Sequence, residues 1–157
     1  MTRNQRTALL PSMIRVTAIG YLIFFVPNLV LASTHHIDTL PPSLARLFDW
    51  GGNADATAVM LSTVYVVWAL FLFRSARAPL AHGLFLDFNL MANSAHFAAM
   101  LIMALTMPEQ HRHAVGVSAL GLISTVPLAA CWLPVRRYAG PAREIAPKAV
   151  IFARSRP

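Results

Sequence analysis

The sequence has little charge and a single cysteine. Of its 157 residues, 12% are Asp, Glu, Lys or Arg, whereas a soluble domain carries roughly 25%. Hydrophobic residues account for 57% of the chain. The composition therefore argues against an ordinary soluble domain. Cys131 has no second cysteine to pair with, so an intramolecular disulfide is excluded and a buried packing role is expected.

Catalytic signatures are also missing from the sequence. It contains no His-Glu-x-x-His zinc motif, no Gly-x-Ser-x-Gly nucleophile elbow, no glycine-rich phosphate loop and no Cys-x-x-Cys pair. No reaction class follows from the residues, and a non-enzymatic role is favoured.

What the chain does contain is four long apolar stretches, at about 14–33, 54–73, 82–106 and 114–133. Each is close to the ~20 residues that cross ~30 Å of hydrocarbon as a helix. Lipid offers no hydrogen-bond partner to the backbone, so spans of this length must be α-helical. We expect an all-α, membrane-embedded four-helix bundle over residues 1–133. A basic, poorly ordered tail should follow at 134–157.

The basic residues indicate how this bundle lies in the membrane. The net charge is +7, and eleven of the thirteen Lys and Arg residues lie before or at the start of the first span, between spans two and three, or after span four. By the positive-inside rule, both termini are then cytoplasmic, in a bacterial cytoplasmic (inner) membrane. This pattern indicates topology and argues against a nucleic-acid partner. Contact of the tail with anionic lipid is a secondary possibility.

The first span has a second interpretation. Arg3 and Arg6 precede an apolar run that ends in Val30-Leu31-Ala32, which has the form of a signal peptide with a small-residue cleavage site. The run is longer than a usual signal core, so a retained helix is favoured. The other three spans keep the same orientation in either case.

Polar residues are concentrated on one face of the third span. Asn89, Asn93 and His96 fall close together at 100° per residue, and turning such groups to lipid costs about 2 kcal/mol or more. This face must therefore meet protein or water. Either it makes interhelical hydrogen bonds, or it lines a pocket for a small molecule, ion or proton with His96 as the titratable member. Asn28 of the first span belongs to the same set of candidates.

Two further features concern packing. Asp87 lies near the cytoplasmic end of the third span, where a carboxylate needs a partner, and Arg15 enters the first span at a similar depth. A buried Arg15–Asp87 pair is predicted, with Arg74 or Arg77 as alternatives. The fourth span carries a stripe of small residues that favours close helix approach. Its members are Ala114, Ser118, Gly121, Thr125 and Ala129.

Histidines suggest an alternative role in metal or haem chemistry. The outward loops carry His35, His36, His111 and His113, and imidazoles suit zinc with carboxylates or copper with thioethers. His82 and His96 are fourteen residues apart, the separation that holds two stacked haems on one helix. A second axial ligand would have to come from a homodimer or another subunit. No cofactor is the main expectation, with haem or copper/zinc as the alternative.

Spans two and three carry a family resemblance in three segments: Met60-Leu-Ser-Thr-Val-Tyr65, Phe73-Arg-Ser-Ala-Arg77-Ala-Pro79 and Asn93-Ser-Ala-His96-Phe-Ala-Ala-Met100. The chain resembles small four-span bacterial inner-membrane proteins of a domain-of-unknown-function family, similar in shape to the BphX and DoxX-like membrane proteins. The resemblance implies a four-helix inner-membrane bundle with cytoplasmic termini, and it brings no established reaction, cofactor or catalytic residue.

These observations together favour a small-ligand-binding or accessory/assembly subunit that uses the polar stripe of the third span. Its partners would be the lipid bilayer and a second copy or other membrane subunits. The alternative is a membrane redox or metal-handling component.

Overall fold

The computed structural model describes residues 2–48 and 55–138. Those residues are mostly helical and contain no strand, so the all-α prediction is confirmed for them. The predicted tail falls, from residue 139 onward, outside the described residues. The elements in chain order are α1 (Arg3–Ser33), η1 (Ile37–Thr39), α2 (Pro42–Phe48), α3 (Asp55–Ser75), η2 (Pro79–His82), α4 (Gly83–Thr106), η3 (Pro108–His113), α5 (Ala114–Trp132) and η4 (Arg136–Tyr138).

Three of the helical stretches are long and apolar enough to cross a bilayer: Asn4–Ser33, Asp55–Ser75 and Pro79–Thr106. The predicted fourth span appears as α5, whose apolar described part, Ser118–Trp132, is shorter. At ~1.5 Å per residue, the 19 residues of α5 give a helix slightly under the ~30 Å of the hydrocarbon layer.

α1 is longer than the predicted span of 14–33, because it begins at Arg3. Its start is fixed by a capping box. The Thr2 backbone N–H donates to the Gln5 side chain at 2.8 Å, and the Gln5 backbone N–H donates to the Thr2 hydroxyl at 3.4 Å. The helix also continues through Pro11 and Pro27. A Thr-x-x-Gln signal therefore sets the helix start well ahead of the apolar run.

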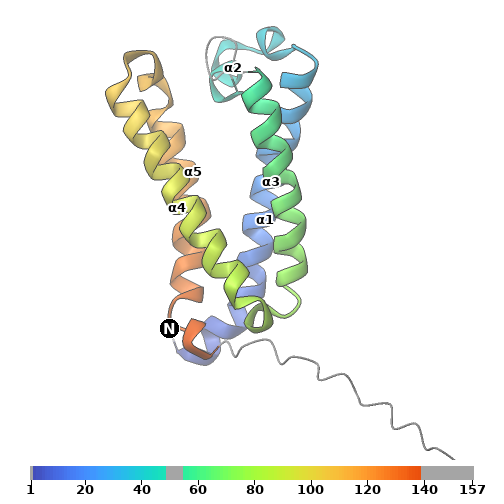
Figure 1. Ribbon diagram of the computed structural model, residues 1–157, viewed down its shortest axis with the longest axis vertical. Helices are drawn as coiled ribbons and strands as arrows, with labels where there is room; N and C mark the ends of the chain where they lie inside the picture. The colour runs from blue at the N-terminus through green and yellow to red at the C-terminus, as the bar shows by residue number, and fades with distance from the viewer. Residues whose placement is uncertain (1, 49–54, 139–157) are drawn as a thin grey trace, which may run out of the picture.

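The four long helices form two pairs, α1 with α3 and α4 with α5 (Figure 1). The pairs meet at the end of the molecule where α1 begins and η4 lies, which we call the terminal half. They diverge toward the opposite end, the α2 half, where α2 and η3 lie. α1 also packs against α5, so this helix joins the two pairs.

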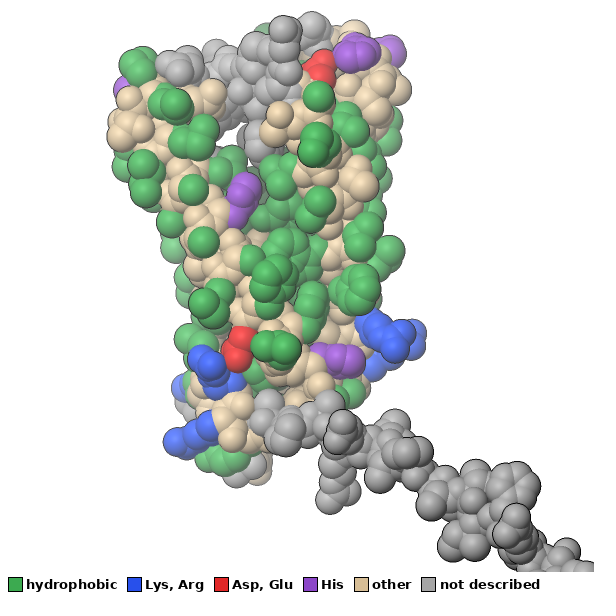
Figure 2. Space-filling model, in the orientation of Figure 1, with side chains coloured by type: hydrophobic (Ala, Val, Ile, Leu, Met, Phe, Trp, Pro, Cys, Tyr) green, Lys and Arg blue, Asp and Glu red, His purple; other side chains and the backbone are tan. Residues whose placement is uncertain are grey.

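The buried core follows this division. Its main cluster lies in the terminal half and draws on all four long helices; it includes Leu10, Ile14, Leu72, Leu86, Leu128 and Trp132. The α2 half has a small cluster made by Ala32, Ile37 and Ala58, with Phe48 packed against it. Among the described residues, α4 and α5 contribute nothing to that small cluster. Figure 2 shows the surface hollowed between the two pairs in this half.

Candidate polar site between the helix pairs

Tyr65 of α3 links the two helix pairs. Its hydroxyl donates to Asn93 Oδ1 of α4 at 3.0 Å, and both residues are buried. Its ring stacks on Phe25 of α1 with 4.1 Å between ring centroids, and it meets Tyr21 edge-on at 5.0 Å. The ring of His96 lies 5.8 Å away. Residues of α1 and α4 therefore both contact the Tyr65 side chain of α3.

Tyr65 is not among the site residues predicted from the sequence. A signal was present, because Ala58, Ser62, Tyr65 and Ala69 recur at spacings of three and four and are all buried on α3. Small and polar residues on one face of a membrane helix indicate an interface with other helices. The sequence prediction considered only the polar stripe of the third span, which is α4. The hydrogen-bond partner of that stripe, Tyr65, lies among the buried residues of α3.

The structure brings Asn89 and Asn93 together as predicted neighbours on α4. The Asn93 side-chain amide donates to the Asn89 carbonyl at 2.8 Å and to Asn89 Oδ1 at 3.3 Å. Asn93 thus uses its amide within α4 and its side-chain oxygen for Tyr65. Both asparagines are buried. Asn93 makes an interhelical hydrogen bond of the kind predicted for the stripe, whereas the hydrogen bonds of Asn89 in the described chain lie within α4.

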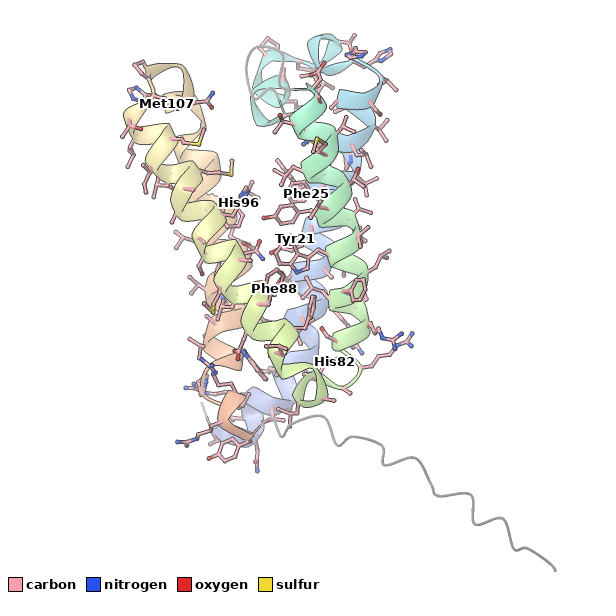
Figure 3. The ribbon with its side chains drawn as sticks, viewed as in Figure 1. Tyr21, Phe25, His82, Phe88, His96 and Met107 are labelled. Carbon is pink, nitrogen blue, oxygen red and sulfur yellow. The ribbon has the colours of Figure 1, made fainter. Side chains whose placement is uncertain are left out.

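His96 lies one turn further along α4 and is only half-buried. Its ring contacts Phe97 as well as Tyr65 and is directed into the space between the two pairs (Figure 3). Within residues 2–48 and 55–138 the imidazole makes no hydrogen bond. His96 therefore offers two ring nitrogens at the point where the packed half ends and the hollow begins.

Asn28 is separate from this group. Its side-chain amide donates to the Ser62 hydroxyl at 3.0 Å, so it joins α1 to α3 within one pair. Its side-chain oxygen is buried and has no hydrogen-bond partner among the described residues. The structure therefore supports the interhelical role of Asn28 and does not bring it to Asn89 or Asn93.

Tyr21 is a second buried group with unused hydrogen-bonding capacity. Its hydroxyl lies beside Ser124 of α5, whose own hydroxyl donates to the Leu120 carbonyl at 2.7 Å. In the described part of the chain the Tyr21 hydroxyl has no partner that meets hydrogen-bond geometry. The contact between α1 and α5 therefore places the Tyr21 hydroxyl beside Ser124 without a well-formed hydrogen bond between them.

The predicted Arg15–Asp87 pair is wrong. Asp87 accepts a hydrogen bond from the indole N–H of Trp132 at 2.8 Å, and Arg136 Nη2 lies 3.1 Å from its other oxygen. The Arg15 side chain is exposed. Depth along a span places residues at one level but does not say which helices are neighbours, and α4 packs against α5. The partners therefore come from the end of α5 and the turn that follows it.

The loop histidines do not assemble a site in the described chain. His35 Nδ1 lies 2.8 Å from Asp55 Oδ2, and His36 Nδ1 lies 2.7 Å from the Thr34 carbonyl oxygen. His111 is exposed in η3, and the side chain of His113 is outside the described set. Among the side chains that the structure describes, no three of His, Cys, Asp and Glu come together as metal ligands.

The haem alternative depends on His82 and His96 as a pair. His82 lies in η2 at the terminal end of α4 and His96 beside the hollow, on different parts of the molecule (Figure 3). Neither residue faces another histidine in the described chain within hydrogen-bonding or ring-contact distance.

The small residues of α5 do let two helices approach closely. A Cβ atom added at Gly121 would lie 3.0 Å from both Cβ and Cγ of Phe97 on α4. A larger residue at this position would require the Phe97 side chain to shift by a few tenths of an ångström. This contact holds α4 against α5 beside His96, beyond the main core.

No family model matches the chain, and no curated protein or solved structure matches it either. The resemblance to BphX and DoxX-like membrane proteins stays a prediction. A function must therefore be inferred from the residues of this chain and their arrangement.

Proposed function

We propose that this chain is an integral protein of the bacterial cytoplasmic membrane that binds a small, largely apolar molecule between its two helix pairs. The membrane assignment is supported by three long apolar helices and by the aliphatic side chains that they expose. Leu84 is 86% exposed, Met91 73% and Ile23 71%. Continuous apolar faces of this kind need lipid or protein to cover them.

The proposed orientation has both termini in the cytoplasm. It is supported by the eleven-to-two division of basic residues. Reporter fusions after Gln110 and after Pro157 test it directly. A cytoplasmic signal at Gln110, or a periplasmic signal at Pro157, would contradict the orientation.

The observation that carries the binding proposal is His96 at the inner limit of the hollow. Below it, Tyr65 and Asn93 close the space with a buried hydrogen bond, and around it lie aromatic rings such as Phe97. Pockets for small molecules are typically apolar and carry a few polar groups that orient the ligand. Because one imidazole nitrogen donates and the other accepts, His96 suits a ligand with a carbonyl or hydroxyl group on an apolar body.

The first test asks whether the hollow is open to water. In a Cys131→Ala background, His96→Cys should react readily with a water-soluble maleimide in intact membranes. Ser62→Cys is the matched control, because Ser62 is fully buried within the other helix pair and should stay unreactive. A His96→Cys variant as inert as Ser62→Cys would show that this face is closed.

The second test asks whether a molecule is held there. Native mass spectrometry of the full chain, released from its own membranes in mild detergent, should show a bound small molecule that His96→Leu loses. Met91→Leu changes an exposed residue of the same helix and should keep it. If no bound molecule appears and His96→Leu alters only association with other subunits, the assembly role is the better account. Elemental analysis and an absorption spectrum of the same sample test the redox or metal-handling alternative.

A further inference from the structure

A groove of about 370 Å³ lies at the end of the terminal half, away from the hollow that holds His96. It is formed where the start of α1, the turn η2 and the turn η4 come together. Six residues line it. Three are polar, Asn4, Thr7 and Tyr138, and three are apolar, Ala8, Leu80 and Val135.

The charge around this groove is positive and largely uncompensated. The Arg137 guanidinium lies 5.0 Å above the ring of Tyr138, which forms one wall. Asp87 is the only carboxylate of the described chain at this end, and it is already engaged by Trp132 and Arg136. Arg137 therefore has no carboxylate partner within the described residues.

The helix start beside the groove adds to this field. Asn4, a groove residue, lies in the first turn of α1, and that turn contains no acidic residue. The free N–H groups and the macrodipole of a long helix favour a negative group there. The field of α1 and the charge of Arg137 thus act on the same groove from two sides.

We propose that this groove binds the headgroup of an acidic phospholipid. The phosphate and glycerol would lie against Asn4 and the Arg137 side of Tyr138, and the lipid chains would pass over Ala8 and Leu80 toward the exposed faces of the helices. Two observations favour a lipid over a soluble phosphate. Three of the six residues that line the groove are apolar, and the groove lies where the apolar helices end. The proposal rests on the membrane assignment above and is independent of ligand binding beside His96.

Lipid titration of the full chain in a non-ionic detergent tests the site, with native mass spectrometry as the readout. Phosphatidylglycerol should bind in preference to phosphatidylcholine. Arg137→Gln should weaken phosphatidylglycerol binding about fivefold, since one basic residue near a lipid headgroup contributes about that factor. Ala8→Phe fills the apolar side of the groove without changing the charge, so it should weaken the binding as well.

Arg74→Gln is the matched control. It removes the same charge from the end of α3, where the residue does not line the groove, and it should leave binding unchanged. Equal binding of the two lipids, or equal losses in Arg74→Gln and Arg137→Gln, would overturn the proposal, since either result indicates a diffuse basic surface. Displacement of the lipid by soluble glycerol phosphate at matching concentration would also overturn it. None of these results alters the reporter-fusion or His96 tests, so the proposals fail separately.

Discussion

The terminal half and the α2 half of this protein are built from the same four helices, yet only one of them is packed by all four. In the terminal half, Leu10, Leu72, Leu86 and Trp132 are fully buried, one from each long helix. In the α2 half the small buried cluster belongs to α1, η1 and α3. Both halves are rich in apolar residues, so apolar content does not explain the difference.

The difference lies in the side chains that fasten one helix to another. In the membrane that we propose for this chain, apolar side chains gain little by leaving the bilayer, and helix association depends on close packing and on hydrogen bonds. In the terminal half, Asp87 accepts a hydrogen bond from Trp132 and forms an ion pair with Arg136. The hydrogen bond from Tyr65 to Asn93 joins the two pairs where this half borders the α2 half. In the α2 half, the Asn28–Ser62 bond stays within one pair.

The polar stripe of α4 crosses the boundary between the halves. Asn89 and Asn93 are buried on the packed side, and His96, one turn further, is half-buried beside the hollow. One stripe therefore accommodates both interpretations made from the sequence, with the asparagines in packing and the half-buried histidine as the candidate for binding.

The largest expected effect comes from breaking the packed half at its largest buried side chain. Trp132→Ala should lower the free energy of unfolding by about 3–5 kcal/mol, because the indole is fully buried and the space cannot collapse completely. Ile102→Ala, in the α2 half of α4 at a side chain 61% exposed, should change it by less than about 0.5 kcal/mol. Unfolding in mixed micelles measures both. Comparable losses would contradict the division into a packed and an open half.

The contact between α4 and α5 in the α2 half is tested at a glycine. Gly121→Ala should cost about 1–3 kcal/mol, because the added Cβ would press on the packed Phe97 side chain, which would have to shift by a few tenths of an ångström. Gly20→Ala is the matched control, since nothing lies within 4 Å of a Cβ at Gly20. There the better helix propensity of Ala should leave stability unchanged or raise it by about 0.5–1 kcal/mol. If both variants behave alike, Gly121 is not an interface residue.

The corrected partnership of Asp87 is tested by double-mutant cycles. Asp87→Asn alone should cost about 1–2 kcal/mol, because the indole N–H of Trp132 loses a charged acceptor. Coupling to Arg136→Gln should be about 0.5 kcal/mol, since the Arg136 side chain is 53% exposed and solvent screens the pair. Coupling to Arg15→Gln should be absent, so those two losses should add. Strong coupling to Arg15 would restore the pair predicted from the sequence.

The smallest expected change in stability is at Tyr65, on the boundary between the terminal half and the α2 half. Tyr65→Phe keeps the ring stack on Phe25 but leaves Asn93 Oδ1 without its donor, which should cost about 0.6–1 kcal/mol. Thr63→Val removes an exposed hydroxyl from the same helix and should change stability by less than about 0.5 kcal/mol. The reaction of His96→Cys with maleimide, measured in the Tyr65→Phe background, should become faster, because the bond that closes the floor of the hollow is gone. An unchanged rate would mean that Tyr65 does not limit access.

Several parts of the fold could be predicted from the sequence. The helices follow from apolar length, because a backbone in lipid must satisfy its own hydrogen bonds. The close approach at Gly121 follows from residue size, because Gly121 belongs to the small-residue stripe of the fourth span. The early start of α1 was also encoded locally, by Thr2 and Gln5, although apolar length alone placed the start later.

Only part of the candidate site could be predicted from the sequence. Spacing on one helix identifies a stripe such as Asn89, Asn93 and His96, because residues three and four apart share a face. It does not identify which helix that stripe meets, so Tyr65 was missed and Asp87 was assigned to Arg15 instead of Trp132 and Arg136.

By itself, the sequence determined that this protein is helical, where its helices run and which faces carry polar groups, since each of these depends on the backbone and on neighbours within one turn or two. Only the tertiary structure decided that the helices form two pairs, that the pairs are fastened at one end, and that His96 lies at the edge of the space between them. The physical reason is that apolar helix faces are nearly equivalent to one another in the lipid environment that we propose for them. A few hydrogen bonds and the shapes of facing side chains, from distant parts of the chain, then select the partners.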